Sequence, residues 1–166
     1  MFRWRGVIGL AAFGGLFWLA RPTFGSCFAG VPFVLVGLAV RFWASGYIGI
    51  EGRAREIGAS RRVVSGPYRT LRHPLYIGNF LLVAGMLVVL RPGVAVSVAV
   101  LVLFVVEYSF IVVAEEAKLA LVEIGESRVE SRESFVPRRA LCEWRTWLAT
   151  GAALGLALLK AALRAR

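Results

Sequence analysis

The feature that most constrains this chain is a series of long apolar runs separated by short polar connections. The runs occupy residues 6–20, 24–40, 74–90, 94–114 and 146–159. Hydrophobic residues make up 58% of the sequence, whereas a soluble domain contains about 45–50%. Apolar runs of this length are typical of membrane helices. The sequence therefore predicts an all-α fold, a polytopic transmembrane helix bundle of about five spans.

The length of 166 residues allows a single domain. Within it we expect two N-terminal transmembrane helices (residues 1–50), a core with a transmembrane hairpin at 74–114 (residues 51–145), and a C-terminal transmembrane or interfacial helix (residues 146–166). A basic start before the first run also fits a signal peptide. No small-x-small cleavage site follows, and the second run begins almost at once, so we favour a first transmembrane helix.

The basic residues are concentrated in two of the loops. Six arginines lie in residues 51–73, and five arginines and one lysine lie in residues 115–145, whereas the first and third turns carry only Arg21 and Arg91. Cytoplasmic loops of membrane proteins carry an excess of Lys and Arg. Both large loops and the N-terminus are therefore predicted to be cytoplasmic. We expect an integral protein of the bacterial inner (plasma) membrane.

The C-terminal residues do not follow this rule. Five spans would place Lys160, Arg164 and Arg166 outside, where the rule expects few basic residues. The last apolar run is therefore either a fifth span, a re-entrant segment or an interfacial helix, and the sequence leaves these alternatives open.

Charge and composition exclude several classes of function. The net charge of +10 reports orientation in a polytopic protein, so we expect no nucleic-acid partner. Cys27 and Cys142 fall on opposite membrane faces, which argues against a disulfide. The chain has one histidine and no CxxC motif, so we expect no protein-bound metal. The oligomeric state stays open.

Two polar clusters interrupt the apolar sequence. One lies in residues 65–78, S-G-P-Y-R-T-L-R-H-P-L-Y-I-G, and consists of Tyr68, Arg69, Arg72, His73 and Tyr76. The other is the pair Glu115 and Glu116 at the end of the fourth run. Residues 91–93, Arg-Pro-Gly, are too few for anything but a tight turn, so the third and fourth runs form an antiparallel hairpin. The hairpin should bring the two clusters together.

Two further charged residues lie in or beside apolar runs. Glu107 shares a helix face with Ile111 and Glu115, about 12 Å deeper along the axis than Glu115. It is either a functional carboxylate or a structural one, in an ion pair or protonated within the bundle. Arg41 is either a boundary residue that extends to the interface or an inward-facing partner for a membrane carboxylate.

The chemistry of the two clusters suits a ligand with both charge signs. Arginine and histidine beside two carboxylates fit an amino-acid group, and tyrosine faces fit a purine or a cation. S-adenosylmethionine presents an ammonium, a carboxylate, an adenine and a sulfonium. A heme ligand or a lipid-headgroup clamp would look similar, so the residues alone leave the ligand open.

Two motifs resemble those of a known superfamily. Residues 65–68, S-G-P-Y, and 72–78, R-H-P-L-Y-I-G, resemble the S-G-P-Y…R-H-P-x-Y-x-G signature of the isoprenylcysteine carboxyl methyltransferase and phospholipid methyltransferase superfamily. Its second signature, E-E-x-x-L…F-G-E…V-P-R, is similar to residues 115–119, 125–126 and 136–138. The resemblance extends over residues 41–139.

The resemblance implies a membrane methyltransferase whose cytoplasmic loops form an S-adenosylmethionine pocket beneath an acceptor tunnel that opens to the membrane. The implied cofactor-binding residues are Val63, Tyr68, His73, Pro74, Leu75, Tyr76, Glu115 and Glu116. One of the two glutamates would hold the amino end of the cofactor. The implied catalytic residues are Arg72, Glu115, Glu116 and Arg138, the two arginines being partners for a cofactor carboxylate or an acidic acceptor.

The acceptor is less well defined than the cofactor. Between Glu116 and Pro137 the chain is about two residues longer than the family pattern, Ile124 replaces a phenylalanine, and Arg128 stands near a usual tyrosine. We expect methyl transfer to a lipid-like or isoprenoid acceptor among membrane lipids, of the isoprenylcysteine carboxyl O-methyltransferase type. Phospholipid or small-amine N-methylation is the alternative. A nicotinamide-dependent membrane reductase and a non-catalytic scaffold are alternatives of other classes.

Overall fold

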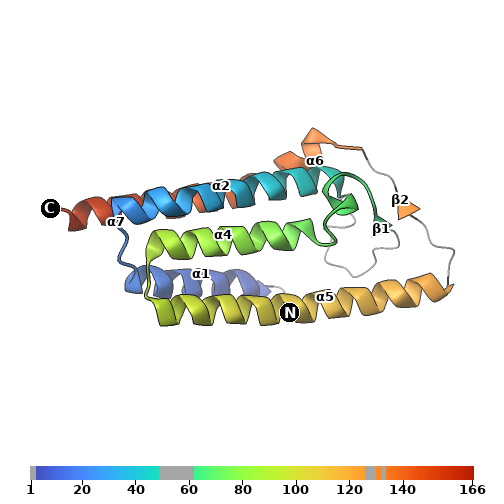
Figure 1. Cartoon of the computed structure of the whole chain (residues 1–166), viewed down its shortest axis with the longest axis horizontal. Helices are drawn as coiled ribbons and strands as arrows, with labels where there is room; N and C mark the ends of the chain where they lie inside the picture. The colour runs from blue at the N-terminus through green and yellow to red at the C-terminus, as the bar shows by residue number, and fades with distance from the viewer. Residues whose placement is uncertain (1–2, 49–61, 126–129, 132–133) are drawn as a thin grey trace.

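The computed structural model describes residues 3–48, 62–125, 130–131 and 134–166. The elements in chain order are α1 (Arg3–Leu19), α2 (Phe24–Tyr47), β1 (Arg62–Val63), the 3₁₀ helix η1 (Gly66–Arg69), α4 (Pro74–Leu90), α5 (Val94–Gly125), β2 (Glu130–Ser131), α6 (Pro137–Leu141) and α7 (Trp144–Arg164). Successive long helices run in opposite directions along the long axis of the molecule (Figure 1). The prediction of an all-α membrane bundle is confirmed. Its one addition is a two-residue parallel pairing of β1 with β2.

Helices occupy all five predicted apolar runs. By length and composition, α2, residues 94–117 of α5, and α7 can each cross a membrane. The shorter apolar helix α4 has 17 residues, or about 26 Å of rise against a hydrocarbon core of about 30 Å. At 21 residues, α7 is longer than the run predicted at 146–159. A continuous apolar helix of that length favours the fifth span over a re-entrant segment.

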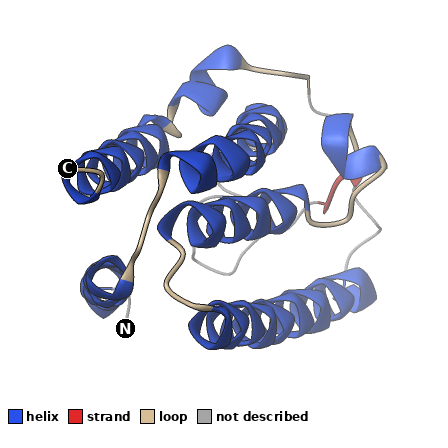
Figure 2. Ribbon diagram, turned by 60° about the vertical axis from the view of Figure 1, so that its left-hand side comes forward, coloured by secondary structure: helices blue, strands red, loops and turns tan. Residues whose placement is uncertain are grey.

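Close contact between α2 and α4 forms the centre of the bundle. In both views α4 lies between α2 and α5 (Figures 1 and 2). Glycines allow the two backbones to approach: a Cβ on Gly37 would lie 2.9 Å from the carbonyl oxygen of Gly78, and one on Gly85 would lie 2.9 Å from the amide of Val34. Small residues give this kind of contact between membrane helices. The contact fixes α4, and therefore the polar residues at its start, relative to α2.

Two tight turns meet at one end of the bundle. The turn before α2 is held by a capping box between Thr23 and Ser26, and the Ser26 hydroxyl also donates to the carbonyl of Val89 at 2.9 Å. The predicted Arg-Pro-Gly turn between α4 and α5 is confirmed, with Arg91 at φ 48° and Gly93 at φ 111°. The third and fourth helices are therefore the antiparallel hairpin that the sequence predicts.

The end of α7 reaches the same end of the bundle. The ammonium of Lys160 donates to the carbonyl of Phe17 and lies 4.6 Å from the centre of its ring. Ala157 is fully buried, in a small core with Ala20 and Leu90. The C-terminus therefore lies with the α1–α2 and α4–α5 turns, opposite the predicted polar clusters (Figure 1).

Candidate active site

The hairpin brings the two predicted polar clusters together. The hydroxyl of Tyr76 donates a hydrogen bond of 2.9 Å to Glu115 Oε2, and His73 Nδ1 lies 3.9 Å from the same oxygen. Arg72 Nε lies 3.2 Å from Glu116 Oε1. Residues some forty positions apart thus form one cluster at the end of the bundle where α4 begins. We call Arg72, His73, Tyr76, Glu115 and Glu116 the polar site.

The local sequence explains how α4 presents these groups. Pro67 and Pro74 occupy the first turns of η1 and α4, where a missing amide hydrogen leaves no helical bond unmade. Gly66 has φ 59°, and a Cβ there would lie 2.5 Å from the ring of Tyr47. A Cβ on Gly78 would lie 2.6 Å from Cγ of Arg41. Both glycines of the first motif are therefore needed for close packing against α2.

One nitrogen of the polar site is buried without a hydrogen bond. The ring of His73 stacks on that of Tyr76, with 5.3 Å between centroids and 14° between planes. Its Nε2 is buried and makes no hydrogen bond within the described part of the chain, since Glu116 Oε1 lies 3.7 Å away. Buried polar atoms in proteins nearly always have a partner. His73 Nε2 is therefore a candidate ligand contact.

The charged groups around this nitrogen remain accessible. The side chain of Arg72 is 61% exposed, and those of Glu115 and Glu116 are 44% and 38% exposed. Ion pairs this open contribute little to stability. The charges can therefore exchange their present partners for those of a ligand.

A second polar group lies beside the polar site, and its carboxylate, Glu143, was not among the residues that the sequence predicted. Arg41 Nε of α2 donates a 3.0 Å hydrogen bond to Oε2 of Glu143, the residue before α7. The hydroxyls of Ser45 and Thr146 donate to the same carboxylate at 3.0 and 3.1 Å. Burial would raise the pKa of Glu143, but the hydrogen bonds and charge of Arg41 outweigh it and lower the pKa. Of the two alternatives for Arg41, the structure shows the inward-facing ion pair.

Hydrogen bonds extend this group to the polar site. The Arg41 guanidinium also donates to Asn79 Oδ1, and Asn79 Nδ2 donates to the hydroxyl of Tyr108 at 2.8 Å. The ring of Tyr108 meets that of Tyr76 edge-on, with 5.0 Å between centroids. Polar contacts thus connect α7, α2, α4 and α5. The ring contact of Tyr108 joins them to Tyr76, which bonds Glu115.

Comparison with known proteins identifies the family of the chain. Residues 26–122 match the family model of phospholipid methyltransferases. The matched region is more than half of the chain. The chain belongs to the phospholipid methyltransferase family. Neither a curated protein nor a solved structure matches it. The matched region contains the hairpin and the whole polar site, whereas Glu143 lies outside it.

Family membership gives the general activity. A phospholipid methyltransferase is an enzyme that transfers methyl groups, here a membrane enzyme acting on a lipid-like substrate. The alternatives of a nicotinamide-dependent reductase and of a scaffold are therefore not supported. The acceptor itself is not identified by the match.

The remaining cofactor residues predicted for this methyltransferase lie in the first turn of α4, on η1 and on β1. Pro74 is buried and Leu75 is half-buried in its first turn, next to His73. Tyr68 lies on η1 and is half-buried. Val63 lies on β1, where its partner in the parallel pairing is Ser131. Their contact with a cofactor stays a prediction.

Two further residues that the sequence singled out are exposed. Arg138 is exposed on α6, which packs against α2, and no described ion pair joins it to the polar site. Glu107 is exposed on the surface of α5 rather than enclosed in the bundle. The predicted acceptor segment around Arg128 lies outside the described residues, so its role stays a prediction.

Proposed function

We propose that the polar site binds S-adenosylmethionine and transfers its methyl group to a lipid-like acceptor on the cytoplasmic side of the membrane. The observation that carries the proposal is the buried, unpartnered Nε2 of His73, stacked on Tyr76 beside two accessible carboxylates. In a family of methyltransferases, such a group is best explained as part of the methyl-donor site.

The side chains of the polar site fit the parts of that cofactor. Glu115 and Glu116 are suited to its ammonium, and the exposed Arg72 to its carboxylate. The flat pair of His73 and Tyr76 offers ring surface and a free nitrogen for the adenine. Each assignment uses a group whose present contacts are either open to solvent or missing.

The chemistry requires alignment more than acid–base groups. When bound, S-adenosylmethionine supplies a methyl carbon on a positively charged sulfur. An electron pair of the acceptor forms the new bond to that carbon while the carbon–sulfur bond breaks, and the sulfur keeps the bonding pair. The chain's contribution is to orient the two reactants, an effect that can provide about 7–11 kcal/mol in favourable cases. The Arg41–Glu143 group would keep Tyr76, and through it Glu115, in place.

Two acceptor classes make different demands on the site. A carboxylate of the isoprenylcysteine type, our first candidate, needs no base and would be held by a guanidinium such as that of Arg72. A phospholipid amine must first lose a proton, which Glu115 or Glu116 could accept. The amine is therefore the second candidate. It is supported by the presence of these carboxylates and by the description of the matched family.

Product chemistry distinguishes the two acceptors. The purified protein would be placed in lipid nanodiscs with methyl-labelled S-adenosylmethionine and either a prenylcysteine or phosphatidylethanolamine. A methyl ester releases methanol in alkali, whereas an N-methyl group is stable. Alkali-labile label indicates carboxyl methylation, and alkali-stable label in the lipid fraction indicates N-methylation. If neither acceptor is labelled and the cofactor does not bind, the proposal is wrong.

A further inference from the structure

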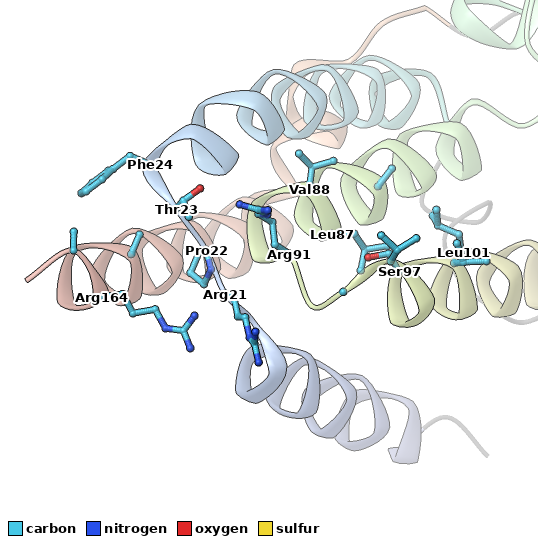
Figure 3. A pocket seen from close by; sticks show the side chains of 16 residues that line it. Arg21, Pro22, Thr23, Phe24, Leu87, Val88, Arg91, Ser97, Leu101 and Arg164 are labelled. Carbon is cyan, nitrogen blue, oxygen red and sulfur yellow. The ribbon is translucent and has the colours of Figure 1, made fainter.

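A large cavity lies at the end of the bundle opposite the polar site. It has a volume of about 1070 Å³ and is formed by the α1–α2 turn, the end of α4, the start of α5 and the C-terminal end of α7. Figure 3 shows its lining. None of the polar-site residues lines it. Its position and composition therefore call for a different occupant from the methyl donor.

The charged side chains that line this cavity are basic. Arg21 comes from the α1–α2 turn, Arg91 from the α4–α5 turn and Arg164 from α7 (Figure 3). All three are exposed, and none makes an ion pair within the described residues. Among the residues that the structure describes, no acidic side chain lines the cavity. Three guanidinium groups from separate elements thus line one cavity, and arginine binds phosphate with paired hydrogen bonds.

Apart from Thr23 and Ser97, the rest of the lining is apolar. Phe24, Val94 and Val98 are 58%, 82% and 53% exposed, and Leu87, Val88 and Leu101 continue the surface along α4 and α5. An inorganic anion would need only the arginines. A molecule with a phosphate and hydrocarbon chains would use both parts, and its size suits a cavity this large.

The charges of this end also conflict with the usual distribution in membrane proteins. With α7 as a fifth span, the three arginines lie on the non-cytoplasmic side, where basic residues are few. Lys160 is accounted for by its bond to Phe17. The arginines are accounted for if they neutralise a bound anion at the membrane surface.

We propose that this cavity binds one anionic phospholipid from the non-cytoplasmic leaflet. Arg21, Arg91 and Arg164 hold its phosphate, and an acyl chain lies against α4 and α5. The bound lipid links both turns to α7. This site is separate from the methyl-transfer site, so the proposal stands or fails independently of the proposed function.

Native mass spectrometry of delipidated protein in detergent tests the proposal directly. Phosphatidylglycerol should bind the wild type more tightly than phosphatidylcholine with the same chains. Arg21→Gln and Arg164→Gln each remove one charge-assisted contact. Each variant should therefore bind phosphatidylglycerol about tenfold or more weakly than the wild type. Arg166→Gln is the matched control: it removes an exposed arginine of the same end that does not line the cavity, and its binding should be unchanged.

A second variant tests the acyl part without changing charge. Val98→Trp fills the apolar lining and should weaken phosphatidylglycerol binding as well. Equal binding of the two lipids, or wild-type affinity in both Arg21→Gln and Arg164→Gln, overturns the proposal. Two further outcomes also overturn the proposal, because each indicates an anion site without an acyl component. One is unchanged phosphatidylglycerol binding in Val98→Trp, and the other is displacement of the lipid by inorganic phosphate at millimolar concentration.

Discussion

Removing the Glu143 carboxylate should be among the most destabilising single changes in the chain. The side chains of Arg41 and Glu143 are only 15% and 10% exposed. In Glu143→Ala the guanidinium stays buried without its counter-ion, and the hydroxyls of Ser45 and Thr146 lose their acceptor. Breaking a buried pair from one side costs about 3–5 kcal/mol. Because Arg41 keeps Asn79 as a partner, we expect about 3 kcal/mol of unfolding free energy.

A double-mutant cycle in mixed detergent micelles measures this value. Unfolding free energies would be compared for wild type, Glu143→Ala, Arg41→Met and the double variant. The double variant should be more stable than Glu143→Ala alone, because no charge is left unpaired. Glu116→Gln is the control: its pair with Arg72 is exposed, so its loss should cost at most about 1 kcal/mol. A loss below about 1 kcal/mol in Glu143→Ala, or strictly additive effects, would refute the reasoning.

Three further predictions concern packing, pH and the connection to Tyr76. Gly78→Ala places a Cβ 2.6 Å from Cγ of Arg41 and should cost about 1–3 kcal/mol of unfolding free energy, whereas Gly155→Ala, with open space around it, should be neutral or stabilising. The pKa of Glu143 is lowered in the folded protein from 4.5. The contribution of this carboxylate to the free energy of unfolding is therefore complete above that pH and is lost as the pH falls through the lowered value. Glu143→Gln should flatten the acid limb of a stability–pH curve, and an unchanged limb would contradict the assignment. Tyr108→Phe removes the hydrogen bond from Asn79. It should lower the rate of methyl transfer by a larger factor than it lowers the folding equilibrium constant. Activity equal to that of the wild type would show that this hydrogen bond does not position Tyr76.

The main features of the fold could be predicted because they depend on local sequence. Apolar runs of helical length define the helices, and the three-residue connection 91–93 leaves no choice but a hairpin. The hairpin in turn brings His73 to Glu115, so half of the candidate site follows from the sequence. The sequence predicts a shorter helix than α7, because Arg145 and Lys160 bound the apolar run 146–159.

The Arg41–Glu143 pair could not be predicted in the same way. Its members are 102 positions apart and lie on or beside helices whose contact no periodicity encodes. In the sequence Glu143 looks like a loop residue before an apolar run. The only available signal was an unexplained arginine near the end of the second run. Similarly, the sequence places Arg21 in a turn and Arg164 near the C-terminus, and only the structure shows that both line one cavity.

Calorimetric titration of the purified protein with S-adenosylmethionine tests the central claim most directly. The wild type and the Arg166→Gln control should bind at millimolar concentration or below, and His73→Ala and Glu116→Ala should bind much more weakly. Nicotinamide cofactor should give no heat of binding. No binding by the wild type would contradict the proposed function, and wild-type affinity in both variants would contradict the assignment of the site.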